Sequence, residues 1–226
     1  MNIEITLPDE SVRTYEKAIT GEEIAFDIGP KLGKDAVAIE INRKLYDTSY
    51  VITENASIKI LTKKDIQSLS ILRHSSAHLL AQAVLNLYPG TLYGVGPDIE
   101  DGFYYDFLFK ENISDADLPK IEKEMLKLSK ANQLFVKSIQ KKPDAMDLFK
   151  NQQFKMELID SADESEGVED SEVSLYSNNE FIDLCRGPHV PNTGFIKHFK
   201  LTRLGGAYWR GDENNSQLQR IYGTSW

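Results

Sequence analysis

The pattern of apolar residues changes near residue 63, and this change constrains the fold more than any other feature of the chain. Up to Thr62 the sequence alternates apolar and polar residues in short runs, which is typical of strands, whereas a long helical pattern begins soon afterwards. Residues 63–69 are polar and show no buried pattern. We therefore predict two domains, residues 1–62 and 63–226, and an α+β fold class. The 226 residues are enough for each domain to bury a core.

The first 62 residues predict a small β-grasp (ubiquitin-like) domain. Alternation over residues 2–7, a turn at Pro8-Asp9-Glu10 and a second run through Val12 and Tyr15 predict a hairpin. A helix is predicted after Thr20, an N-cap residue, and Gly33 predicts its end. Alternating residues in 37–41, 45–52 and 58–61 supply further strands. A sheet crossed by one helix suits this order of elements.

The larger domain is predicted to combine long helices with an antiparallel sheet. Helical spacing covers Ile71 to Tyr88, where Pro89-Gly90 stops it, and Asp115 to Asn132. Strand patterns lie between and after these helices. They cover Tyr93–Val95, Phe103–Leu108, Leu134–Ile139, Lys155–Ile159, Val173–Tyr176, Phe181–Leu184, Phe199–Tyr208 and Gln219–Tyr222.

Composition excludes several classes of protein. The net charge of -9 argues against an indiscriminate polycation that coats nucleic acid, although a local basic groove remains compatible with it. The longest apolar stretch, around residues 77–87, contains Gln82 and Asn86, so no membrane span is expected. The N-terminus lacks the pattern of a secretory signal, and the single cysteine, Cys185, cannot form an internal disulfide. The expected compartment is the cytoplasm.

Three of the four histidines and the only cysteine lie in two short motifs. His74 and His78 are four residues apart on one helix face, and Cys185 precedes His189 by four residues where a strand runs into a turn. Imidazole and thiolate groups can bind zinc or move protons near neutral pH. The two motifs together therefore indicate a functional site, whereas either motif alone would be a weak signal.

At several motifs the sequence resembles the threonyl-tRNA synthetases, and the resemblance extends over its whole length. The motifs are HSSAHLL (74–80), GFYYD (102–106), DLCRGPHVP (183–191), AYWRGD (207–212) and LQRIYGT (218–224). The resemblance implies that residues 1–62 form a TGS domain and residues 63–226 an editing domain for mischarged tRNA. It also implies that the ligase domain, which uses ATP and zinc and through which the parent enzyme forms a homodimer, is absent from this chain.

The activity implied is post-transfer proofreading, the hydrolysis of the ester in seryl-tRNA(Thr). A threonine site excludes serine poorly, because one missing methyl group changes binding by only about 1 to 3 kcal/mol. The partner is then the acceptor end of tRNA(Thr) carrying serine, whose terminal adenosine can stack in a pocket. No phosphate-binding loop occurs, and Gly94, Gly96, Gly205 and Gly206 are interpreted as turn glycines. No cofactor or metal is expected for this reaction.

The resemblance also assigns roles to single residues. It places His74 and Lys155 as the catalytic groups that position or activate water, and the strand pattern described above puts Lys155 on a strand. It places five residues in the wall of the substrate pocket, where Asp183 would hold the serine ammonium. These five are His78, Tyr105, Asp183, Cys185 and His189. Because neighbouring strand residues point to opposite faces, only one of Tyr104 and Tyr105 should face the site.

Two alternatives stay open at this stage. The first is a zinc-dependent aminoacyl-tRNA hydrolase with His74, His78, Cys185 and His189 as ligands, as in the related alanyl-tRNA editing proteins. The second is a non-catalytic tRNA-binding module. Basic side chains in the C-terminal segment are compatible with a tRNA track, while Trp209 is expected to pack in the core. These basic residues are Lys197, Lys200, Arg203, Arg210 and Arg220.

Overall fold

The computed structural model describes residues 2–162 and 171–226. The chain divides into two compact units, Met1–Ile71 with Gly187–Pro191, and Leu72–Arg186 with Asn192–Trp226. Each unit combines helices with sheets, which confirms the predicted α+β class. Among the described residues no helix has the length and apolar character that a membrane span requires.

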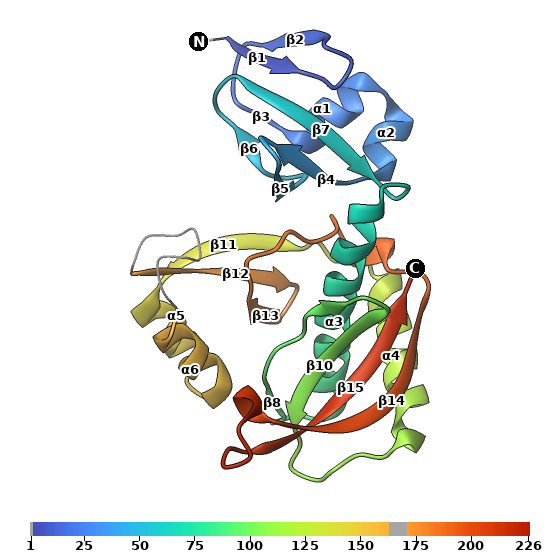
Figure 1. The fold of residues 1–226 in the computed structure, drawn as a ribbon, viewed down its shortest axis with the longest axis vertical. Helices are drawn as coiled ribbons and strands as arrows, with labels where there is room; N and C mark the ends of the chain where they lie inside the picture. Colours follow the sequence, from blue (N-terminus) through green and yellow to red (C-terminus); the bar gives the residue numbers. More distant parts are fainter. Residues whose placement is uncertain (1, 163–170) are drawn as a thin grey trace. The chain divides into compact units, whose positions relative to one another are not determined.

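The N-terminal unit is built on a five-stranded sheet in the order β2-β1-β7-β4-β5 (Figure 1). Strands β1 and β7 are parallel and the other neighbours are antiparallel, as in the predicted β-grasp fold. Isoleucines from both the sheet and a helix form its core, among them Ile5, Ile24 and Ile39. In chain order the elements are β1 (Ile3–Thr6), β2 (Val12–Tyr15), β3 (Ile19–Thr20), α1 (Gly21–Ile28), α2 (Pro30–Asp35), β4 (Ala36–Ile41), β5 (Lys44–Asp47), β6 (Val51–Ile52) and β7 (Ala56–Thr62).

The predicted helix of this unit exists, but as two segments. Thr20 caps α1 as expected, because its hydroxyl accepts the N–H of Glu23 and the Glu23 carboxylate accepts the N–H of Thr20. The helix stops at Gly29 because Pro30 has no N–H to donate and disfavours helical backbone in the residue before it. Gly33 therefore lies inside α2 and does not end the helix, contrary to the prediction.

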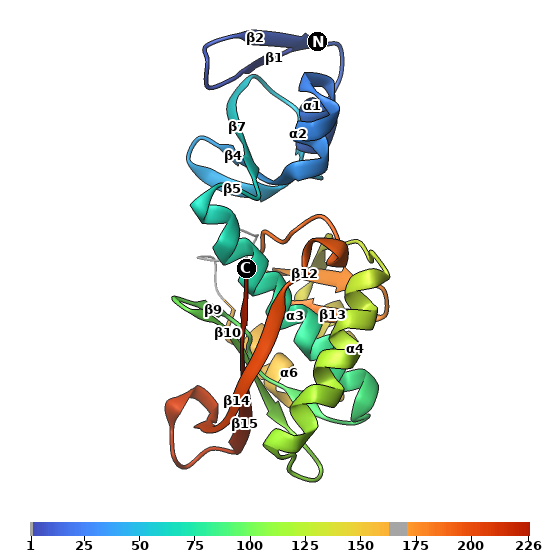
Figure 2. The ribbon, with the colours of Figure 1, turned by 90° about the vertical axis from the view of Figure 1, so that its right-hand side faces the viewer.

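The described residues of the second unit form two antiparallel sheets, and the helix α3 (Ile66–Leu87), which belongs to this unit from Leu72 onward, lies between them (Figure 1). The larger sheet has the order β14-β15-β10-β8, with β9 paired to β10, and the smaller has the order β11-β12-β13. Figure 2 shows α3 and α4 along one face of the larger sheet. The remaining elements are β8 (Leu92–Tyr93), β9 (Asp98–Ile99), β10 (Gly102–Leu108), α4 (Leu118–Lys130), β11 (Val136–Lys141), α5 (Lys142–Leu148), α6 (Gln153–Asp160), β12 (Glu172–Asn178), β13 (Phe181–Leu184), β14 (Phe199–Tyr208) and β15 (Gln217–Ser225).

Two short helices differ from the predicted elements. The prediction of a strand at Lys155–Ile159 is wrong, because these residues form most of α6. The helix buries Phe154 and Lys155 and, one turn later, Ile159, so a helical period with a lysine on its buried side explains the sequence. Helix α5 (Lys142–Leu148) was not predicted; it starts with Pro143 in its first turn, a favoured position. Trp209 is buried against Phe154, as expected.

Candidate functional site

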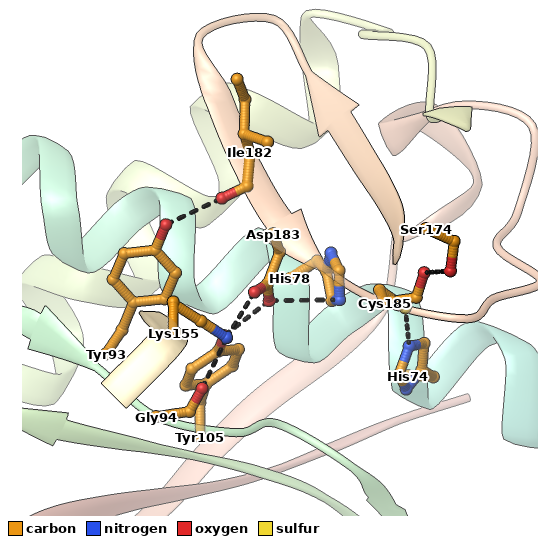
Figure 3. Close-up of polar contacts among 10 residues, drawn as sticks. All are labelled: His74, His78, Tyr93, Gly94, Tyr105, Lys155, Ser174, Ile182, Asp183 and Cys185. Carbon is orange, nitrogen blue, oxygen red and sulfur yellow. Dashed lines mark hydrogen bonds and ion pairs between the residues drawn. The ribbon is translucent and has the colours of Figure 1, made fainter. Parts of the chain in front are cut away.

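The first part of the site is a histidine pair on α3 beside the only cysteine (Figure 3). His74 and His78 are one turn apart, and their ring centroids lie 5.1 Å from each other. The Nε2 atom of His74 lies 3.0 Å from Sγ of Cys185, which follows β13. Cys185 is held by Ser174 of β12, whose hydroxyl donates to its carbonyl at 2.6 Å. Sequence reasoning thus identified three side chains that the fold brings together from α3 and the end of β13.

The second part is the ammonium group of Lys155, which is almost completely buried. Its side chain is 1% exposed and reaches from α6 to three oxygen partners. It donates to the carbonyl of Gly94 at 2.6 Å and to the hydroxyl of Tyr105 at 3.0 Å, and it forms an ion pair with Oδ1 of Asp183. An ammonium has three hydrogens, so these three partners use its full donor capacity. In this arrangement Lys155 is a fixed positive charge.

The third part is the carboxylate of Asp183 on β13, which balances that charge. The Tyr105 hydroxyl donates to Oδ2 of Asp183 at 2.6 Å, and Nε2 of His78 lies 3.5 Å from the same oxygen. The side chain of Asp183 is 4% exposed. A buried charge needs partners because its desolvation is costly, and here Lys155 and Tyr105 supply them. The role of Asp183 in holding a serine ammonium stays a prediction, and such a substrate group would meet a carboxylate that already has internal partners.

Burial sets the protonation of the two histidines. It lowers the pKa of His78 to about 3, with the nearby Asp183 opposing the shift. Burial also lowers the pKa of His74, against the attraction of Asp98 and Asp183. Both rings are therefore neutral near pH 7, and the contact of His78 with Asp183 joins a neutral imidazole to a carboxylate. A neutral imidazole can accept a proton, which is the property required of a general base.

The two adjacent tyrosines of β10 point to opposite faces, as predicted from strand geometry. Tyr105 is fully buried and joins Lys155 and Asp183, and burial raises the pKa of its hydroxyl. Tyr104 lies on the other face, where the guanidinium of Arg220 is 3.7 Å from the centre of its ring. Arg220 forms two hydrogen bonds to Asp106, at 2.6 and 2.8 Å. Only Tyr105 belongs to the site.

Sequence reasoning missed Tyr93, Gly94 and Gln152. The ring centre of Tyr93 lies 4.8 Å from Nζ of Lys155, and its hydroxyl donates to the carbonyl of Ile182 beside Asp183. Gly94 was interpreted as a turn glycine, yet its carbonyl accepts from Lys155 and a Cβ there would lie 2.9 Å from the Trp209 ring. A backbone carbonyl has no sequence signature, so no pattern could have identified this contact.

Two further predictions concern His189 and the basic residues of the C-terminal segment. His189 lies in Gly187–Pro191, which groups with the N-terminal unit, and its backbone N–H donates to Asp47 at 2.9 Å. Among the basic residues of the predicted tRNA track, Lys200 pairs with Glu122 at 2.8 Å and Arg203 stacks on Tyr222. The track stays a prediction, with Lys200 and Arg220 each held by an acidic residue.

Comparison with known proteins gives two family matches and many close relatives. Residues 3–62 match the TGS domain, and residues 173–222 match the threonyl and alanyl tRNA synthetase second additional domain. Over 98% of its own length, the chain is 49% identical to a threonine--tRNA ligase of Hahella chejuensis. Over 99% of its own length, it is 48% identical to a threonine--tRNA ligase of Burkholderia multivorans. It spans 34% and 35% of these two proteins. Over nearly its whole length, the chain is similar to the N-terminal region of threonyl-tRNA synthetases.

Only some residues of the site lie within the matched second additional domain. The second additional domain contributes Asp183 and Cys185, whereas His74, Tyr105 and Lys155 precede the residues matched to it. The residues before the match are nevertheless similar to the relatives, because the alignments cover nearly the whole chain. The site is therefore assembled from residues within the domain match and from residues that precede it.

Proposed function

We propose that this chain hydrolyses the ester bond of seryl-tRNA(Thr), as the editing region of a threonyl-tRNA synthetase. One observation carries the proposal: the neutral, half-buried His74 at Cys185 is linked through His78 to the buried charge pair of Lys155 and Asp183. The relatives are named threonine--tRNA ligases, so their product is an aminoacyl ester that a second site can proofread. Serine differs from threonine by one methyl group, which limits discrimination at a first site.

The proposed reaction uses His74 as the base. Water attacks the ester carbonyl while His74 accepts a proton from it, and the bond from the carbonyl carbon to the ribose oxygen then breaks. The ribose oxygen takes up the proton, which leaves free serine and deacylated tRNA. The charge of Lys155 stabilises the negative oxygen that develops on the carbonyl, an electrostatic role that needs no proton transfer from the ammonium. His78, Tyr105 and Cys185 form the polar wall around the seryl group.

The experiment that tests the proposal compares two substrates under single-turnover conditions. Seryl-tRNA(Thr) should lose its amino acid far faster than threonyl-tRNA(Thr), and His74→Ala should lower the seryl rate by about 10²- to 10⁴-fold. His198→Ala is the matched control, because His198 is exposed and outside the site. Equal rates for the two esters would reject editing. Binding of tRNA without hydrolysis would favour the non-catalytic binding module.

A zinc-dependent hydrolase is the second candidate, and one observation favours it. The ligating atoms of His74, His78 and Cys185 all lie within 4.8 Å of one another. A neutral imidazole and a thiolate are suitable zinc ligands, and zinc would supply an activated water. We expect hydrolysis to survive a chelator. Stoichiometric zinc in the purified protein, together with loss of activity on chelation, would instead support the metal reaction.

A ligase activity of the full-length protein is also a proposal. The relatives are named threonine--tRNA ligases, so we propose that the full-length protein attaches threonine to tRNA. The ATP and zinc of a ligase domain, and the homodimer, stay expectations from the resemblance of the sequence. The chain covers about a third of the length of those relatives. Neither ATP nor zinc is required for the hydrolysis proposed above.

A further inference from the structure

A glutamine side chain forms hydrogen bonds with the free backbone edge of the last strand in the larger sheet. Strand β8 pairs with β10 on one side and is the last strand of the sheet. On its other side the amide of Gln152 accepts the N–H of Tyr93 at 3.2 Å and donates to the carbonyl of Thr91 at 3.3 Å. This is the donor and acceptor pair that a neighbouring strand would offer. The side-chain amide of Gln152 thus holds residue 152 at the edge of β8.

The same residue starts the helix that carries Lys155. Gln152 is the N-cap residue of α6, and its carbonyl accepts the N–H of Lys155 at 3.0 Å. One residue beyond Tyr93, the carbonyl of Gly94 accepts the Lys155 ammonium. Gln152 and Lys155 therefore contact successive points of one short segment, residues 91–94, which contains β8. The side-chain amide of Gln152 fixes the position of the first turn of α6. From this position the ammonium of Lys155 reaches Gly94 and Asp183.

Other contacts of α6 do not involve the amide of Gln152. Phe154 packs on Trp209 with ring centroids 4.7 Å apart, and the Trp209 indole N–H donates to Glu157 at 2.7 Å. These contacts retain the helix against the sheet when the amide of Gln152 is removed.

We propose that Gln152 is a positioning residue for Lys155 in the hydrolysis proposed above, on which this inference rests. It holds α6 so that the ammonium is placed between Gly94, Tyr105 and Asp183. Displacement of a catalytic group by about 1 Å can lower a rate about 100-fold. Loss of the two amide bonds should therefore change the chemical step more than the binding of tRNA.

The test is a double-mutant cycle on the full chain. Gln152→Met keeps the length of the side chain and removes both amide bonds, and Gln153→Met at the exposed next position is the matched control. We expect Gln152→Met to lower the single-turnover rate on seryl-tRNA(Thr) about 10- to 100-fold with tRNA affinity unchanged. Gln152→Met should add no loss in a Lys155→Met background, because Gln152 acts through Lys155. An equal further loss in that background would overturn the proposal.

A second readout does not depend on activity. The ammonium signal of Lys155, observed by NMR with ¹⁵N-labelled lysine, should exchange slowly with water in the native protein and in Gln153→Met. It should exchange faster in Gln152→Met. Should that variant fail to fold, Gln152→Glu replaces it, because it keeps the length and the acceptor for the Tyr93 N–H. Unchanged exchange in the folded variant would overturn the inference, whereas inactivity of the native protein would reject only the proposed function.

Discussion

Strand β10 carries a tyrosine on each face, and each tyrosine meets a cation that is paired with an aspartate. On the inner face Tyr105 contacts Lys155 and Asp183; on the outer face Tyr104 stacks on Arg220, which binds Asp106. The side chains of Lys155 and Asp183 are 1% and 4% exposed, and those of Arg220 and Asp106 are 23% and 6% exposed, so the two pairs differ mainly in the burial of the cation. Each group combines a tyrosine, a cation and an aspartate, but the cation is a lysine on the inner face and an arginine on the outer face, and their surroundings differ.

The origin of the two groups differs as well. Asp106 and Arg220 are direct partners across β10 and β15, so sheet pairing alone brings the outer group together. The inner group needs β10, β13 and α6, three elements far apart in the sequence. A buried ion pair gives little net stability, because desolvation offsets the attraction between the charges. The inner group is thus better explained by a functional requirement than by folding.

Removal of one inner charge should give the largest loss of stability. Lys155→Met leaves Asp183 buried without its cation, so we expect the free energy of unfolding to fall by about 3 to 5 kcal/mol. The double variant Lys155→Met/Asp183→Leu should recover most of this loss. Arg220→Met, the matched change on the outer face, should cost about 1 to 2 kcal/mol. Urea unfolding measures all three, and a double variant less stable than Lys155→Met would contradict this explanation.

The tyrosine hydroxyls provide a finer comparison. Tyr105→Phe removes a hydroxyl that bridges Asp183 and Lys155, and it should lower the free energy of unfolding by about 1.5 to 3 kcal/mol. Tyr104→Phe keeps the ring on Arg220 and should change the free energy by less than about 0.5 kcal/mol. The comparison fails if thermal or urea unfolding shows equal losses for the two variants.

The pH dependence of stability should report the buried histidine. The pKa of His78 is lowered to about 3 in the folded chain, so above about pH 6.5 the ring is neutral in both states. Below that pH the unfolded chain binds a proton that the folded chain does not, and stability falls toward pH 3. Between pH 7.5 and 5.5 this costs about 1.4 kcal/mol. Lowered pKa of His74 acts in the same direction.

Substitution separates the contribution of His78 from those of other groups. His78→Gln should lower the pH dependence by about that amount between pH 7.5 and 5.5, whatever its effect at a single pH. His198→Gln, at an exposed position, serves as the control. Urea unfolding at the two pH values gives the difference. If His78→Gln leaves it unchanged, His78 is not held neutral in the folded chain.

The sequence predicted more of the fold and of the histidine cluster than of the charge network. The hairpin, the long α3 and most strands follow from apolar periodicity, and the rarity of histidine and cysteine pointed to His74, His78 and Cys185. Lys155 was attributed to a strand because its buried side was not recognised, and a lysine is a poor marker of a buried face. Gln152 acts through backbone groups of β8, which only the folded chain brings near it.

The most direct test measures hydrolysis of seryl-tRNA(Thr) by the native chain and by two double variants. Lys155→Met/Asp183→Leu replaces the inner charge pair and Arg220→Met/Asp106→Leu the outer pair, each by apolar side chains of similar size. We predict that the inner variant loses at least about 100-fold in single-turnover rate while it still binds tRNA, and that the outer variant stays within a few-fold of the native rate. A folded inner variant that hydrolyses seryl-tRNA(Thr) at the native rate would contradict the account.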